Sequence, residues 1–177
     1  MNECLNLAVQ EPLRRGRLGD RTARSAEVVT RSLQRYADRG VFRALSSEPG
    51  RGGRVEFRLT WLTRESLTVT YEPRTGALTF RGLLPGVSAK SAPFADVTAL
   101  IEGRRSRAIP EHKRVDGRRV RLSWSTRNGD MSLTVHVRGP HHEYGVQRGL
   151  NLVNDLFVLL HADYPDYLAE HFGLPAE

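Results

Sequence analysis

The side chains best suited to bind a metal ion lie close together near the end of a predicted strand. His136 belongs to that strand, and His141, His142 and Glu143 follow it in a short turn. Imidazole nitrogens and carboxylate oxygens are common ligands of divalent transition metals, so these four residues could share one ion. The segment has neither a helical His-Glu-x-x-His spacing nor a paired cysteine. We therefore favour solvated or structural histidines and keep a metal-dependent enzyme at this turn as an alternative.

Other catalytic signatures are missing from the sequence. No Gly-x-Ser-x-Gly segment would present a serine nucleophile, and the single cysteine, Cys4, has no obvious base beside it. The glycines of 16–19 and 51–54 do not have the spacing of phosphate-binding loops. One cysteine also excludes an intramolecular disulfide. We expect a non-enzymatic protein without a cofactor.

Arginine is the second source of possible chemistry. The 177 residues include 27 Lys or Arg against 20 Asp or Glu, for a net charge of +7, and Lys90 and Lys113 are the only lysines. Guanidinium groups favour phosphates and other planar anions. The charge is uneven, because residues 155–177 contain five acids and no Lys or Arg. A basic body with an acidic end allows binding of nucleic acid or another polyanion, and gives the protein a polarity for docking.

Alternating strands would place many of these arginines on one face of a sheet. Apolar side chains occur at every second position in 55–61, 67–71, 78–80, 120–124 and 131–137, which is the period of half-buried antiparallel strands. The opposite face carries serines, threonines and a set of arginines: Arg54, Arg58, Arg81, Arg119, Arg121 and Arg138. This face could contact phosphates. The aromatic residues of the strands have core parity, so we expect no platform there for stacking bases.

The remaining segments predict one α+β domain. We expect residues 1–21 to form a mobile N-terminal arm and residues 22–177 to form the domain, which starts with an amphipathic helix. A strand at 41–47 completes an antiparallel sheet of about six strands, made of a four-strand meander plus a hairpin turning at Asn128-Gly129. Helices pack on one face of this sheet.

Two connections and a short helix separate the meander from the hairpin. Residues 82–93 are rich in Gly, Pro and Ser, and a helix follows to Gly103. The next linker, with Arg104–Arg107, Lys113-Arg114 and Arg118-Arg119, is a second basic cluster.

The last helix, from about Tyr144 to Ala162, is apolar around more than half of its circumference. One of its two apolar stripes is formed by Leu152, Leu156 and Leu159. Such a helix is buried, either across the sheet or in an interface with a partner protein or a second copy. No stretch approaches the roughly 18 apolar residues of a membrane span, and Met1–Gln10 lacks the basic start of a secretory signal. We expect a soluble cytoplasmic protein without membrane contacts.

The order of these elements over residues 22–165 resembles the small α+β fold of type III secretion chaperone-like proteins, which runs helix, three strands, helix, two strands, helix. The resemblance implies a dimeric, non-enzymatic protein that holds an extended partner segment on apolar patches. A protein-interaction module is thus the first functional hypothesis. Nucleic-acid or polyanion binding through the arginine-rich face is the second, and the His/Glu turn is the third.

Overall fold

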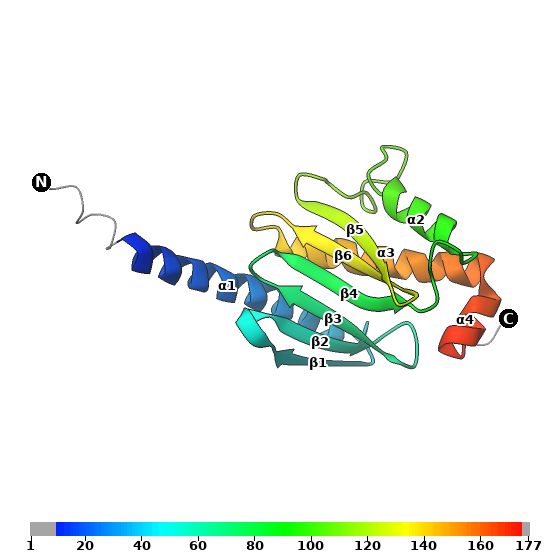
Figure 1. The fold of residues 1–177 in the computed structure, drawn as a ribbon, viewed down its shortest axis with the longest axis horizontal. Coiled ribbons are helices and arrows are strands. Elements are labelled where there is room, and N and C mark those ends of the chain that lie inside the picture. Colours follow the sequence, from blue (N-terminus) through cyan, green and yellow to red (C-terminus); the bar gives the residue numbers. More distant parts are fainter. Residues whose placement is uncertain (1–9, 175–177) are drawn as a thin grey trace, which may run out of the picture.

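A six-stranded antiparallel sheet with helices on one face makes up the protein (Figure 1). The computed structural model describes residues 10–174, with side chains from Gly19 onward. Its strands are β1 (Ala44–Pro49), β2 (Val55–Thr60), β3 (Ser66–Glu72), β4 (Ala77–Leu84), β5 (Val120–Arg127) and β6 (Asp130–Val137). Its helices are α1 (Gln10–Asp38), α2 (Phe94–Gly103), α3 (His142–Asp163) and α4 (Pro165–Phe172). The α+β class, the meander and the hairpin predicted from the sequence are confirmed.

The strands lie in the order β1-β2-β3-β4-β6-β5, and every neighbouring pair is antiparallel. The second strand of the β5–β6 hairpin therefore joins the meander, and β5 is an edge strand, like β1. Asn128 and Gly129 adopt φ values of 55° and 88°, as the tight hairpin turn requires.

Helix α3 crosses the apolar face of the sheet at close range. A Cβ atom added to Gly145 would lie 2.4 Å from Val137 Cγ2, and one added to Gly149 would lie 3.0 Å from the ring of Phe80. These glycines let the helix backbone approach strands β6 and β4. The stripe of α3 that contains Val146 and Val153 is fully buried in the same core as the inward side chains of the sheet.

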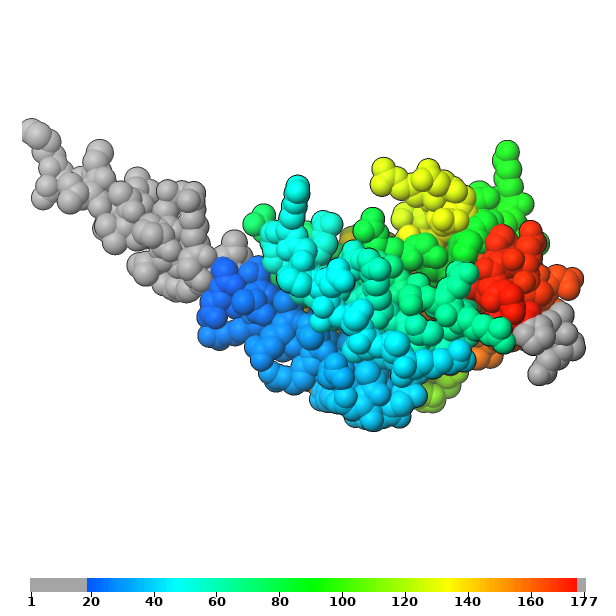
Figure 2. Space-filling view, turned by 90° about the horizontal axis from the view of Figure 1, so that it is seen from below, coloured from blue at the N-terminus to red at the C-terminus, as the bar shows by residue number. Residues whose placement is uncertain are grey.

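Helix α1 packs beside α3 through its C-terminal half, where Val29 and Leu33 are fully buried. Seen from below, α1 lies along β1 and the turn that follows it, at the opposite end of the molecule from α4 (Figure 2). The helix begins at Gln10, so residues 10–21, which we assigned to a mobile N-terminal arm, belong to the first helix. Arginine and leucine favour helix intrinsically, and Pro12 is tolerated in a first turn. The rest of the predicted arm, with Cys4, lies outside the described residues.

Strand β4 also differs from the prediction, because it continues through Gly82 to Leu84 instead of ending before residue 82. Its register against β6 shifts between Phe80 and Leu84, which marks an irregularity of the bulge type. No helix in the described part of the chain is long and apolar enough to cross a membrane.

Candidate functional site

The face of the sheet opposite the helices is polar and uncovered by any described helix (Figure 1). A row of hydroxyl side chains crosses it from strand to strand, with paired positions Thr70–Thr79, Thr79–Thr134 and Thr134–Ser123. The hydroxyls of Thr79 and Thr134 are 3.0 Å apart. We call this surface the open face. Its character agrees with the alternation seen in the sequence.

The predicted arginines of the open face are partly neutralised by neighbouring carboxylates. Arg54 pairs with Glu72 at 3.3 Å, and Arg58 lies 3.5 Å from Glu56. These four side chains are exposed or half-exposed, so the pairs contribute little to stability. Their charges nevertheless offset one another, which weakens this side of the sheet as an anion site.

Three further arginines of the predicted set are exposed, namely Arg81, Arg121 and Arg138. None of the three forms an ion pair within residues 19–174. Arg121 stands opposite His136 across the β5–β6 pair. Burial lowers the pKa of His136, and the positive charge of Arg121 lowers it further. His136 is therefore a neutral hydrogen-bonding group near pH 7, with its Nε2 2.9 Å from the Ser123 hydroxyl.

Arg119 is the member of the predicted set that the structure places elsewhere. Its guanidinium carbon lies over the ring of Tyr144, 5.1 Å from the centroid, and Tyr144 belongs to α3 on the helical side of the sheet. Arg119 precedes the first residue of β5, so the two-residue alternation does not apply to it. Its place on the open face was predicted wrongly for this reason.

Arg119 instead lines an arginine-rich hollow with a volume of about 520 Å³. The loop between α2 and β5 forms one wall, and the first turns of α3 form the other. The hollow is lined by two acidic residues, Glu111 and Asp116, and by six arginines. The six arginines are Arg105, Arg107, Arg114, Arg118, Arg119 and Arg148. We call this hollow the arginine cleft. Its loop wall corresponds to the second basic cluster of the sequence.

Tyr144 is the centre on which the arginine cleft is built. Its hydroxyl accepts the backbone N–H of Asp116 at 2.9 Å and donates to the carbonyl of Arg114 at 3.4 Å. The guanidinium carbon of Arg148 lies 4.8 Å from the centroid of the same ring. Two guanidinium groups next to one aromatic ring gain cation–π attraction and lose freedom of movement. The tyrosine thus fastens the loop to α3 and orders two of the six cations.

Arg148 is further held by the loop, since it donates a hydrogen bond to the carbonyl of His112. Its Nε is buried and has no hydrogen-bond partner among the described residues. Tyr144 and Arg148 were missed by the analysis of the sequence. Their spacing of four residues places them on one face of a helix, but only the fold brings that face to the basic loop.

A buried ion pair anchors the start of the same loop. Arg104 and Asp155 form a charge-assisted hydrogen bond, and their side chains are only 7% and 14% exposed. Lys113 approaches the other oxygen of Asp155 at 3.3 Å. The backbone N–H of Val115 donates to the carbonyl of Arg104 at 2.8 Å, which closes the loop. The loop wall of the arginine cleft is therefore held to α3 by several hydrogen bonds and a buried ion pair.

The predicted metal ligands are not brought together. His136 lies on the open face, whereas the Nδ1 of His142 is 3.2 Å from the hydroxyl of the buried Tyr71. Glu143 forms an ion pair with Arg35 of α1 at 2.8 Å. No group of three or more His, Cys, Asp or Glu within the described residues could hold a metal ion, so the structure does not support the alternative of a metal site at His136, His141, His142 and Glu143.

The predicted interface on α3 is largely part of the core. Leu152 is 2% exposed and Leu156 is fully buried, while Leu159 is half-buried. Since the chain itself covers the first two side chains, they cannot form a surface for a partner or a second copy. The sequence correctly indicated burial of this stripe, and the helix lies across the sheet.

Comparison of the chain with protein-family models, with curated proteins and with solved structures finds no match.

Proposed function

We propose that this protein binds nucleic acid through its phosphate backbone, with the arginine cleft as the main contact. The observation that carries the proposal is that six arginines line one hollow, whose loop wall is hydrogen-bonded to Tyr144 of α3. Ordered guanidinium groups lose less entropy on binding an anion than free ones do, and they match phosphate geometry in bidentate contacts. Binding of this kind reads charge and shape, so it is independent of base sequence.

The open face supports the same function in a secondary role. Strand β5 of this sheet begins at Val120, directly after Arg119 of the arginine cleft. The open face contributes hydroxyl groups together with Arg81 and Arg121. The strand aromatics Phe57, Tyr71 and Phe80 are fully buried on the other face. The open face therefore offers phosphate contacts without a surface for stacked bases, which favours duplex over single-stranded ligands.

Salt dependence tests the proposal. Fluorescence anisotropy with labelled mixed-sequence duplex DNA and RNA should show affinity that falls steeply with salt, with a slope of about 0.9 per phosphate contacted. Arg107→Gln/Arg118→Gln removes two exposed charges that form no ion pair in the described structure. This double variant should weaken binding and reduce the slope by about two.

The matched control is Arg43→Gln/Arg64→Gln, which removes the same charge from exposed positions next to β1 and in the β2–β3 loop. Because β1 and β5 are opposite edges of the sheet, this variant should bind like the wild type. Equal losses in both variants would mean that net charge acts without a site. Binding that is absent at low salt would reject the function.

The protein-interaction role and the resemblance to type III secretion chaperones stay predictions. If such a role exists, its contact surface must lie away from Leu152 and Leu156. Among the described residues the exposed large apolar side chains are Val41, in the connection between α1 and β1, and Val158, on α3.

A further inference from the structure

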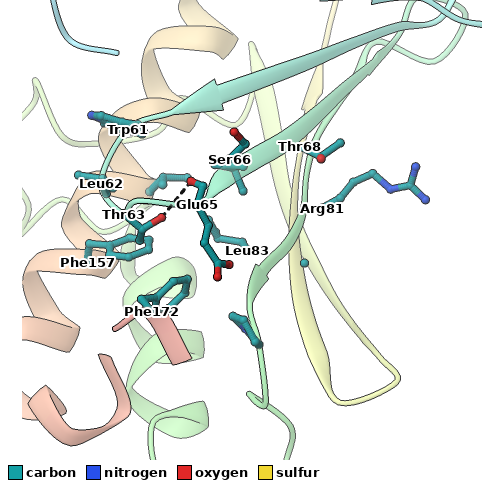
Figure 3. Close-up of a pocket in the computed structure, with 14 residues that line it drawn as sticks. Trp61, Leu62, Thr63, Glu65, Ser66, Thr68, Arg81, Leu83, Phe157 and Phe172 are labelled. Carbon is teal, nitrogen blue, oxygen red and sulfur yellow. Dashed lines mark hydrogen bonds between the residues drawn. The ribbon is translucent and has the colours of Figure 1, made fainter. Parts of the chain in front are cut away.

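A second cavity, of about 130 Å³, opens where β3 and β4 separate (Figure 3). The pairing between these strands ends at Thr68 and Arg81, although β4 continues beyond that point. The irregular stretch of β4 leaves Arg81 and Gly82 exposed, and Gly82 takes a positive φ of 54°. Bulged strands commonly lie beside functional sites because they redirect side chains.

Polar and apolar side chains both line this cavity, and the apolar ones belong to the core or pack against it. Val153 and Phe157 of α3 form its floor together with Phe172 of α4, and the rings of the two phenylalanines are 5.4 Å apart. Leu83 adds a buried aliphatic side chain from the bulge. A cavity of about 150 Å³ with an apolar lining can hold one benzene molecule in a protein. This cavity thus has room for about one ring or one branched aliphatic group.

One carboxylate stands at the mouth of the cavity. Glu65 lies in the β2–β3 loop, where its backbone carbonyl accepts a hydrogen bond from the Thr63 hydroxyl at 3.1 Å. In Figure 3 the Glu65 side chain extends toward Phe172, whereas Arg81 points away from the cavity. The Glu65 carboxylate has no hydrogen bond or ion pair among residues 19–174. A pocket with apolar side chains on one wall and a single free carboxylate directed at it is complementary to an apolar group that carries positive charge.

We propose that this cavity binds a small organic cation: one ring or branched aliphatic group in the pocket, joined to an ammonium or guanidinium that pairs with Glu65. Two sources can supply this chemistry. One is a free amine, and the other is a peptide in which a bulky apolar residue adjoins Lys or Arg. The cavity and the arginine cleft share no lining residue, so the two sites can be tested separately.

Trp61 lines the cavity and provides the signal for the test. The chain has two tryptophans, so Trp124→Phe leaves Trp61 as the only one. We expect phenethylamine to change the emission of this variant in a saturable way. The acid of matching shape, 3-phenylpropionate, should bind about fivefold more weakly, which is the range of a single exposed ion pair.

Glu65→Gln in the same background should abolish the preference for the amine. Glu48→Gln is the control, since it neutralises an exposed carboxylate on β1 that pairs in register with Glu56 and does not line the cavity. A peptide amide, Gly-Phe-Arg, distinguishes the sources: tighter binding than phenethylamine supports a peptide, and equal binding supports a free amine. No saturable change with any of these ligands, or an unchanged preference in Glu65→Gln, would overturn the proposal.

Discussion

Replacing Asp155 with alanine is the perturbation whose cost follows most directly from the structure. Asp155 accepts a hydrogen bond from the Arg104 guanidinium, and both side chains are almost fully removed from solvent. The Nε of Arg104 is already buried without a hydrogen-bond partner. Asp155 is the only carboxylate that pairs with Arg104 among the described residues. Removing one member of a buried ion pair leaves an uncompensated charge in a poorly polar environment. We expect the free energy of unfolding to fall by about 3–5 kcal/mol.

Denaturation by urea, followed by circular dichroism, measures this loss. Lys113→Ala is the control, because Lys113 contacts the same carboxylate but is 45% exposed, and its loss should cost less than about 1 kcal/mol. The double change Arg104→Met/Asp155→Leu should recover most of the stability, since an apolar pair can replace a buried ion pair at little cost. If Asp155→Ala lost no more than Lys113→Ala, the pair would be solvated and the reasoning would be refuted.

Three further predictions concern packing and protonation. Gly145→Ala should destabilise the protein by about 1–3 kcal/mol in thermal unfolding, because its Cβ would meet Val137 at 2.4 Å; Gly117→Ala, with open space around it, is the control and should change little. Tyr167→Phe should cost about 1 kcal/mol in the same assay, since the Tyr167 hydroxyl donates to the carbonyl of Pro85 at 2.7 Å. Burial lowers the pKa of His142, and the charge of His141 lowers it further, so the folded state disfavours its protonation. The free energy of unfolding should therefore fall below about pH 6.5, and denaturation across pH 4–8 should show a smaller fall in His142→Gln.

The parts of the fold that were predictable are those in which one local pattern decides the outcome. Alternation along β6 placed Leu133 and Val135 in the core and Thr134 on the open face, as observed. Asn128-Gly129 defined its hairpin because few other dipeptides accept two successive positive φ values. These signals depend on neighbours in the sequence, so no knowledge of distant contacts was needed.

The errors occur where local pattern and structure are decoupled. Residues 10–21 show no apolar period in the sequence although they are helical, so the pattern that identifies an amphipathic helix could not find them. Composition suggested a loop from residue 82, but β4 passes through Gly82 as a bulge, which glycine permits by its positive φ. The second difference bears on the proposed cation site, since the irregular stretch of β4 borders the cavity beside Glu65.

The candidate sites show the same limit in the arrangement of charge. The sequence identified a basic linker, but a run of arginines is usually only a solvated surface, and nothing local distinguishes the two. What distinguishes this basic linker from a solvated surface is its contact with Tyr144 and Arg148, which lie outside the linker in the sequence. They line the same hollow as the linker because α3 packs closely on the sheet through its glycines. Conversely, His136 and His142 are six residues apart but point to different surfaces, since a strand ends between them. Proximity in sequence is therefore a weak guide to a shared site in this protein. The hydrogen bonds and cation–π contacts that order the arginines of the cleft are the stronger reason to expect that these arginines bind a common anion.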